Sequence, residues 1–185
     1  MTAPLRAGII GYGYMGQIRR RNIADRPDLQ FAAVCDPGRP AEVASLGVQV
    51  FDTWEALVES DLDVVFVCTP NYLIPEITIH ALYRQRHVFC EKPPGRSLAD
   101  IQRIRAAEHA NPRTTVLFGF NHRHHPGITD AKALIDSGAL GEIFTLRGTY
   151  GKDGGYDYHK SWRNDPAVGG GGILLDQGIH MLDLF

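Results

Sequence analysis

Apolar residues in the first two thirds of the chain form short runs that alternate with segments of helical periodicity. Runs of strand length occur at 7–10, 30–35, 48–51, 63–68, 87–90 and 115–120. The run Asp63–Cys68 is almost continuously apolar, which is typical of a strand buried on both faces. Strands that alternate with helices predict a parallel sheet with right-handed crossovers, so we expect a doubly wound α/β fold of Rossmann type.

The segments between these strands carry helix signals. A helix is expected over about 15–25, and a shared helix face is predicted for Ile74, Ile77, Ala81 and Leu82.

Two helix starts are marked by capping residues. Asp52 or Thr53 is suited to cap a short helix that carries a tryptophan. The segment 97–100, Ser-Leu-Ala-Asp, reads as a capping box for a helix with Ile101 and Ile104 turned inward.

The rhythm changes after Asn121. A helix is expected from 126 to 137, ended by Gly138, and the alternation at 143–150 predicts a strand. A polar loop rich in Gly, Tyr and Trp then spans 151–172, and 173–185 is apolar and helix-like.

We therefore expect two domains. Residues 1–121 are predicted to form a Rossmann domain. Residues 122–185 are predicted to be the start of a second domain, of α+β type.

Composition fits a globular protein: 44% of the 185 residues are apolar, 22% are charged, and the formal net charge is −2. This charge favours neither nucleic acid nor an anionic membrane as partner. No apolar run reaches about 18 residues, and no leader pattern is found at the start, so we expect no membrane span and no signal peptide.

The three cysteines, Cys35, Cys68 and Cys90, each close an apolar run. Buried thiols in a reducing cytoplasm are the favoured interpretation, with a disulfide or metal site as the alternative.

The segment 11–16, Gly-Tyr-Gly-Tyr-Met-Gly, lies between a predicted strand and a predicted helix. In this context it is the fingerprint of a dinucleotide site, in which Gly11 makes the turn, Gly13 lets the pyrophosphate approach and Gly16 packs the helix on the sheet. The backbone of Tyr14 and Met15 opens the helix, whose N-terminus attracts phosphate.

Asp36 lies 20 residues after Gly16, at the end of the second predicted strand. A carboxylate there accepts hydrogen bonds from ribose hydroxyls and repels a 2′-phosphate, which favours NAD over NADP. Arg39 is the competing feature, because a guanidinium can pair with a 2′-phosphate or stack on adenine.

Four further motifs follow the glycine motif in a fixed order. They are Thr69-Pro70-Asn71, Glu91-Lys92-Pro93, the Trp-Arg-Asn-Asp of 162–165 and the glycine-rich 170–180. Together these motifs resemble the Gfo/Idh/MocA oxidoreductase family, whose members are dehydrogenases of sugars, inositols and related compounds. The resemblance spans the whole chain.

The resemblance implies that Lys92 sits beside the nicotinamide and the reacting oxygen, with Asp176 and His180 in the same pocket. Alcohol oxidation needs a base for the hydroxyl proton, which suits a histidine, and an ammonium stabilises the developing alkoxide. Asp176 and His180 are four residues apart, so they share a face on a helix, where Asp176 can orient the imidazole or bind a substrate hydroxyl. Surface positions for these polar groups are the alternative.

The same resemblance implies cofactor contacts at Thr69, Pro70, Asn71 and Glu91. One position departs from the family pattern, because Ile74 stands where a histidine is usual. That departure puts the local loop contacts in doubt and leaves the reaction class unchanged.

The run 121–126, Asn-His-Arg-His-His-Pro, invites a metal-site interpretation. Adjacent histidines in an extended segment point to opposite faces, and no acid stands at ligand spacing, so we expect no metal. The resemblance instead implies that Arg123 lies near the substrate.

Aromatic and cationic residues between 150 and 163 suit a polyol with an anionic group, as in a sugar acid or nucleotide sugar. Tyr150, Trp162 and Arg163 are the candidate contacts. A solvated loop with a packed tryptophan is the alternative.

These features predict hydride transfer between NAD(H) and a hydroxyl or keto carbon of a sugar, polyol, sugar acid or nucleotide sugar. The resemblance implies that residues 1–121 are an NAD-binding Rossmann domain and that residues 122–185 are the start of an incomplete α+β substrate and oligomerisation domain. Family members continue well beyond this length in a large antiparallel sheet, so we expect a truncated member whose full-length parent forms a homo-oligomer. A non-catalytic NAD-binding module, and a subunit that borrows its missing half from another polypeptide, remain as alternatives.

Overall fold

The computed structural model describes residues 3–151 and 157–185. Contacts between Cα atoms divide the chain into two units, Met1–Gly119 and Phe120–Phe185.

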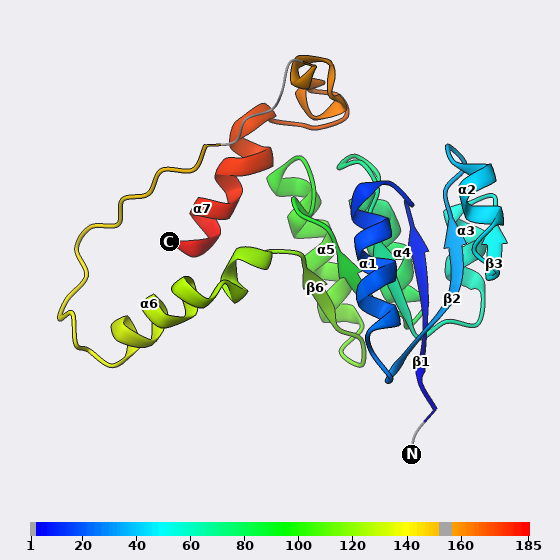
Figure 1. Ribbon diagram of the computed structural model, residues 1–185, viewed down its shortest axis with the longest axis horizontal. Helices are drawn as coiled ribbons and strands as arrows, with labels where there is room; N and C mark the ends of the chain where they lie inside the picture. The colour runs from blue at the N-terminus through cyan, green and yellow to red at the C-terminus, as the bar shows by residue number, and fades with distance from the viewer. Residues whose placement is uncertain (1–2, 152–156) are drawn as a thin grey trace. The chain divides into compact units, whose positions relative to one another are not determined.

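The first unit is built on one parallel sheet of six strands (Figure 1). The spatial order is β3-β2-β1-β4-β5-β6, and every neighbouring pair is parallel. The strands are β1 (Leu5–Ile10), β2 (Leu29–Cys35), β3 (Gln49–Phe51), β4 (Val64–Val67), β5 (His87–Cys90) and β6 (Val116–Phe118). The order reverses between β1 and β4, which is the switch point where ligands bind in doubly wound folds. The predicted fold class is confirmed.

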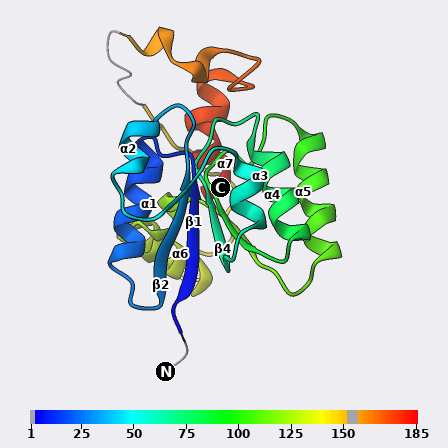
Figure 2. The same cartoon turned by 90° about the vertical axis from the view of Figure 1, so that its right-hand side faces the viewer.

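Helices cover both faces of this sheet, and Figure 2 shows α1 and α2 on one side with α3, α4 and α5 on the other. Their bounds are α1 (Tyr14–Ala24), α2 (Pro40–Ala44), α3 (Trp54–Glu59), α4 (Ile74–Tyr83) and α5 (Leu98–Ala110).

Two aliphatic clusters fill the space between sheet and helices. One joins β4 to α4 through side chains such as Val65, Ile77 and Leu82, and the other joins β1 to α1 through Ile9 and Ile23. All five of these side chains are buried, so the sheet is covered on both faces as the apolar run of β4 predicted.

The three thiols are free, as expected, and Cys35 and Cys90 are fully buried. Burial raises the pKa of the Cys35 thiol to about 11, with Asp36 adding to the effect. Burial also raises the pKa of Cys68 and Cys90 well above the ordinary thiol value.

Both predicted helix caps are present. The Thr53 hydroxyl accepts from the Ala56 N–H at 3.2 Å, and the Ser97 hydroxyl accepts from the Asp100 N–H at 3.2 Å. The prediction that Ile101 faces inward is wrong, because its exposed fraction is 36% while Ile104 is buried. The inward stripe of a helix is narrow, and Ile101 lies at its edge in the first turn.

The second unit contains short helices only, within 120–151 and 157–185. They are the 3₁₀ turns η1 (Asn121–His124), η2 (Tyr158–Lys160) and η3 (Trp162–Asn164), the helix α6 (Pro126–Asp136), the π-helical turn η4 (Leu174–Gly178) and α7 (Ile179–Leu184). Gly138 follows α6 with a φ of +73°, a conformation that glycine adopts readily and that ends the helix as predicted.

The strand predicted over 143–150 is not formed, and this prediction is wrong. Every residue of that segment is exposed, and the described part of the second unit contains no strand that would pair with it. An apolar alternation favours a strand only where neighbouring backbone satisfies its N–H and C=O groups.

Among the described residues, no helix combines the length and the apolar character needed to cross a bilayer.

Candidate cofactor site and active-site residues

The glycine loop joins β1 to α1 with a backbone that only small residues permit. Gly11 has a φ of +89°, and a Cβ there would lie 2.6 Å from the carbonyl oxygen of Cys68. A Cβ on Gly16 would collide with the carbonyl oxygen of Gly11. These two glycines therefore serve the close approach of loop, helix and sheet.

Gly13 differs from its neighbours because no atom lies within 4 Å of a Cβ built on it. It is the N-cap of α1 and has no side chain to cap the helix, whose first-turn N–H groups begin at Tyr14 and Met15. Open space in front of a helix N-terminus fits the pyrophosphate of a dinucleotide.

Asp36 follows β2 and faces the glycine loop. One carboxylate oxygen accepts from the Tyr12 N–H at 2.6 Å, and the other accepts from the Gly38 N–H at 3.0 Å. Each carboxylate oxygen has a second lone pair, so this carboxylate still has the capacity to accept from ribose hydroxyls. Arg39, the competing candidate, pairs with Glu42 at 2.9 Å.

Thr69, Pro70 and Asn71 follow β4 at the carboxyl edge of the sheet. The Asn71 side chain is buried, and the buried Thr69 hydroxyl has no hydrogen-bond partner among residues 3–151 and 157–185. Ile74, the departure from the family pattern, is fully buried at the start of α4, so the side chain at this position packs in the core.

Glu91, which follows β5, is held by an ion pair with a largely buried arginine. Its carboxylate accepts from the Arg19 Nε at 2.7 Å, and both side chains are largely buried. The Arg19 guanidinium also lies over the Phe89 ring, 4.5 Å from its centroid. A Cβ on Gly119 would lie 3.0 Å from the Glu91 carboxylate, so a glycine is suited to that position.

Arg19 was missed by the sequence analysis. A buried glutamate in the Glu-Lys-Pro motif indicates that a cation must accompany it, but the run Arg19-Arg20-Arg21 offers three candidates. Lys92 follows Glu91 directly, is partly buried, and precedes a cis peptide bond to Pro93.

In the second unit, Asp176 is buried within a hydrogen-bonded group. Its carboxylate accepts from the Tyr158 hydroxyl at 3.0 Å and from the Gln177 side-chain amide at 2.8 Å, and the Arg163 Nε lies 3.4 Å away. Desolvation, and then the hydrogen bond to Asp176, raise the pKa of Tyr158.

His180, also buried, lies four residues further along in α7. Its ring stacks on the ring of His122, with the centroids 4.0 Å apart. The rings of Tyr150 and Phe120 meet His180 edge-on, at centroid distances of 6.0 and 6.2 Å. The structure thus brings Tyr150 to His180 and Arg163 to Asp176, two of the four predicted substrate contacts.

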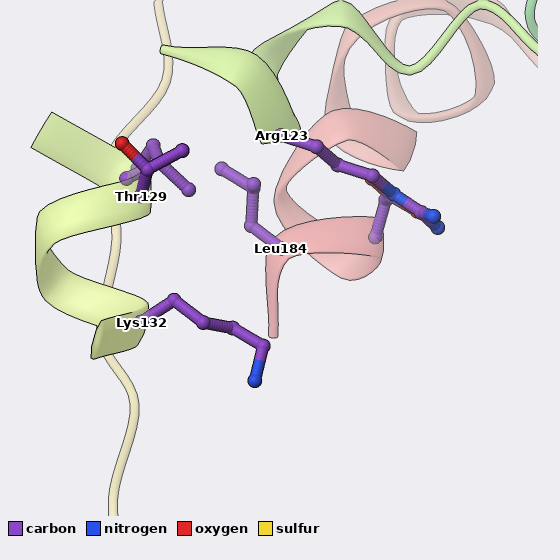
Figure 3. A pocket seen from close by; sticks show the side chains of 6 residues that line it. Arg123, Thr129, Lys132 and Leu184 are labelled. Carbon is purple, nitrogen blue, oxygen red and sulfur yellow. The ribbon is translucent and has the colours of Figure 1, made fainter. Parts of the chain in front are cut away.

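Arg123 has a different setting. Its guanidinium forms an ion pair with Asp183, with the Nε donating at 2.8 Å. Both residues line a pocket of about 440 Å³ in which Leu184 points between Thr129 of α6 and Arg123 (Figure 3).

Trp162 packs against Arg163, whose guanidinium lies 4.5 Å from the ring centroid. Of the other residues in the aromatic and cationic loop, Lys152 and Tyr156 lie outside the described residues.

The histidine run is a 3₁₀ turn, so the expectation of an extended segment is wrong. The His125 N–H donates to the His122 carbonyl at 3.1 Å, which closes the turn, and Pro126 favours the extended backbone of His125 that ends it. Within 3–151 and 157–185, no three His, Cys, Asp or Glu side chains gather as a candidate metal site.

The comparisons with known protein families cover most of the chain. The family model described as "Oxidoreductase family, NAD-binding Rossmann fold" matches residues 5–120, and the one described as "GFO/IDH/MocA C-terminal domain" matches residues 128–185.

Curated relatives are similar over most of this chain. Levoglucosan dehydrogenase of Pseudarthrobacter phenanthrenivorans is 31% identical over 97% of this chain and 50% of its own length. D-glucoside 3-dehydrogenase of Escherichia coli is 33% identical over 98% of this chain and 53% of its own length. The chain therefore spans about half the length of the curated relatives it matches.

Solved structures of dehydrogenases are also similar over most of this chain. A levoglucosan dehydrogenase in complex with NADH superposes with a TM-score of 0.87 and 30% identity, over 98% of this chain and 53% of that one. The scyllo-inositol dehydrogenase of Lactobacillus casei with bound NAD(H) and scyllo-inositol gives a TM-score of 0.81 and 26% identity, over 98% and 55%.

Proposed function

The chain belongs to the Gfo/Idh/MocA oxidoreductase family, and on that premise we propose that it transfers a hydride between NAD(H) and a hydroxyl or keto carbon of a sugar or polyol. The names of its relatives, dehydrogenases of levoglucosan, a D-glucoside and inositol, support this substrate class. A sugar acid or nucleotide sugar is the extension suggested by Arg163, whose Nε lies 3.4 Å from the Asp176 carboxylate.

The observation that carries the proposal is the burial of two ionisable side chains, Asp176 and His180, in the segment that matches the family's C-terminal domain. Ionisable groups are rarely buried without a partner or a chemical role. Here the carboxylate is held by Tyr158 and Gln177, an arrangement that fixes an acceptor in place.

The residues of the first unit fit NAD. The open space at Gly13, the N-terminus of α1 and the buried hydroxyl of Thr69 are suited to hold it, with Asp36 at the ribose end. When bound, NAD⁺ accepts the hydride from the substrate carbon. Because Asp36 is anionic and fixed by two N–H groups, we propose that NADH is preferred to NADPH.

Each of the three candidate catalytic residues is assigned to a part of the reaction in this proposal. The Lys92 ammonium stabilises the negative charge that develops on the substrate oxygen. His180 takes the hydroxyl proton in oxidation and returns it in reduction. Asp176 binds a neighbouring hydroxyl of the polyol, or orients the imidazole.

The remaining assignments are proposals of the same kind. Tyr150, Trp162 and Arg163 are proposed to contact the substrate, and the full-length form is proposed to be a homo-oligomer. Arg123 links η1 to α7 through its ion pair with Asp183. We propose that this contact also holds Arg123 close to the substrate.

The test is oxidation of a panel of sugars and polyols with NAD⁺, followed by NADH absorbance. In the full-length parent, Lys92→Ala is expected to keep NAD affinity and to lower kcat by about 10²-fold or more, as loss of an oxyanion-stabilising group does. Arg26→Ala, which removes an exposed cation paired with Asp28, is the control and is expected to have no effect.

Two outcomes would contradict the proposal. Turnover by Lys92→Ala at the wild-type rate would remove Lys92 from the chemistry. NAD binding by the full-length parent with no hydride transfer to or from any member of the panel would favour a cofactor-binding module.

A further inference from the structure

Two histidine rings stack face to face in the second unit, and only one of them has a role in the proposed reaction. His122 comes from η1 and His180 from α7, with ring centroids 4.0 Å apart and an angle of 16° between the ring planes. The exposed fraction of His180 is 4%, whereas His122 is partly exposed.

This geometry determines how the two rings interact. Imidazole N–H groups and lone pairs lie in the ring plane, so nearly parallel rings direct them past one another. The pair therefore exchanges no proton directly and interacts through packing and charge. Two protonated imidazoles at this separation repel, so protonation of one ring disfavours protonation of the other.

The two rings differ in how far they are removed from solvent. Desolvation disfavours the charged form of His180 more strongly, because it is the more buried ring. The Tyr150 hydroxyl lies 3.5 Å from the His122 Nε2, so the neutral phenol faces His122. Phe120 adds an uncharged edge to His180.

Two carboxylates near the histidine pair each lie beside an arginine. Asp176, one turn before His180, has Arg163 3.4 Å away and accepts from Tyr158 and Gln177. Asp183, in the same helix as His180, is ion-paired with Arg123. These carboxylates therefore favour an imidazolium at His180 less than isolated carboxylates would.

We propose that His122 is a positioning residue for hydride transfer, which holds the His180 ring by stacking and disfavours its protonation. The inference rests on the proposed role of His180 as the base of the reaction. A neutral His180 is the form that accepts the substrate hydroxyl proton, so this pairing extends base activity to lower pH. In oxidation the hydride of the substrate carbon would pass to bound NAD⁺, the hydroxyl proton would move to a ring nitrogen of His180, and His122 would be unchanged in the step.

The test is an NMR titration of the Cε1–H signals of the full chain without cofactor or substrate. The chain has eight histidines, and the signals of the pair are assigned with His122→Phe and His180→Gln. In His122→Phe an aromatic ring still stacks on His180 but carries no proton. We expect its His180 midpoint to lie about one pH unit above that of the wild type, because the coupling is lost.

Two further variants complete the design. His122→Lys carries a fixed positive charge beside His180, so the His180 midpoint in this variant is expected to stay below that in His122→Phe. If His122→Phe does not fold, the comparison of His122→Lys with the wild type is decisive. His124→Phe is the matched control, because His124 is exposed in the same 3₁₀ turn, and it is expected to leave the His180 midpoint unchanged.

Coincident His180 midpoints in the wild type and His122→Phe would overturn the inference, as would a His180 midpoint in His122→Lys above the wild-type value. Neither result depends on turnover. A coupled titration in a chain without hydride transfer would overturn the proposed function alone, and turnover with an uncoupled titration would overturn the role of His122 alone.

Discussion

The two units differ in what they bury. In the first unit, aliphatic side chains from β1, β4, α3 and α4 are fully removed from solvent on both faces of a sheet. Within residues 120–151 and 157–185 no aliphatic side chain is buried, and the buried residues are Gly169, Asp176, Gln177 and His180. Buried side chains form a hydrophobic core in the first unit, whereas in the described part of the second unit the buried side chains are polar groups held by hydrogen bonds and ring contacts.

This difference separates two kinds of functional residue. Gly11, Gly13 and Asp36 sit on a scaffold with its own core, so their geometry follows from the packing of β1 and α1. Asp176 and His180 depend on hydrogen bonds and ring contacts, which contribute less per interaction than a buried aliphatic side chain. We therefore expect the cofactor-binding unit to be the more stable.

The chain offers a direct way to compare the stability of its units, because its two tryptophans, Trp54 and Trp162, fall one in each. In the single-tryptophan variants Trp162→Phe and Trp54→Phe, urea unfolding followed by fluorescence should give different midpoints. We expect the Trp162 signal to change at a urea concentration lower by more than about 1 M, as a difference of a few kcal/mol implies. Coincident midpoints would show that the units unfold together.

A core truncation sharpens the same comparison. Leu82→Ala removes a fully buried side chain of α4 and should lower the free energy of unfolding of the first unit by about 2–5 kcal/mol. Leu134→Ala removes an α6 side chain that is half exposed, and should change stability by no more than about 0.5 kcal/mol. Equal costs for the two variants, measured by urea titration, would contradict the contrast.

Ion pairs offer a second contrast. Arg19→Met leaves the Glu91 carboxylate buried without its cation, and should lower the free energy of unfolding by about 3 kcal/mol. Lys132→Met breaks the exposed pair with Asp136, for which we expect a loss of less than about 0.5 kcal/mol. A loss for Arg19→Met as small as that of the control would show that the buried pair does not hold the Glu-Lys-Pro segment.

The smallest expected effect concerns cofactor choice. Asp36→Ser removes the anion from the ribose end of the site, so the preference for NADH over NADPH should shrink by about tenfold, or about 1.4 kcal/mol. Calorimetric titration of both cofactors measures this ratio. Asp28→Ser, which removes an exposed carboxylate paired with Arg26, is the control and is expected to leave the ratio unchanged. Tighter binding of NADPH than NADH by the wild-type chain would give Arg39 the larger role.

The sequence predicted the first unit well because its local and tertiary signals agree. Every predicted strand up to residue 120 is present, and the caps at Thr53 and Ser97 are made as expected. The strand prediction for 143–150 is wrong because an alternating pattern produces a strand only where a neighbouring strand pairs with its backbone. The described part of the second unit contains no strand that could do so.

In the candidate site, too, the sequence does not predict contacts between residues that are distant in the chain. Asp176 and His180 were predicted by motif resemblance, and the structure adds Tyr158 and His122 as their neighbours. These neighbours lie 18 and 58 residues from their partners in the chain, so no local periodicity reports them. Arg19 is equally remote from Glu91, at a separation of 72 residues.

Binding of NAD by the glycine loop of the first unit is tested most directly at Gly13. Titration of the full chain with NADH, followed by nicotinamide fluorescence, is compared with that of Gly13→Ala. A Cβ at this position touches no protein atom, so the free energy of unfolding should fall by no more than about 1 kcal/mol, the cost of alanine at an N-cap. The affinity for NADH should fall by about tenfold or more, because the methyl group takes the place of the pyrophosphate. Equal affinity of the two proteins for NADH, or no binding by the wild-type chain, would contradict the account.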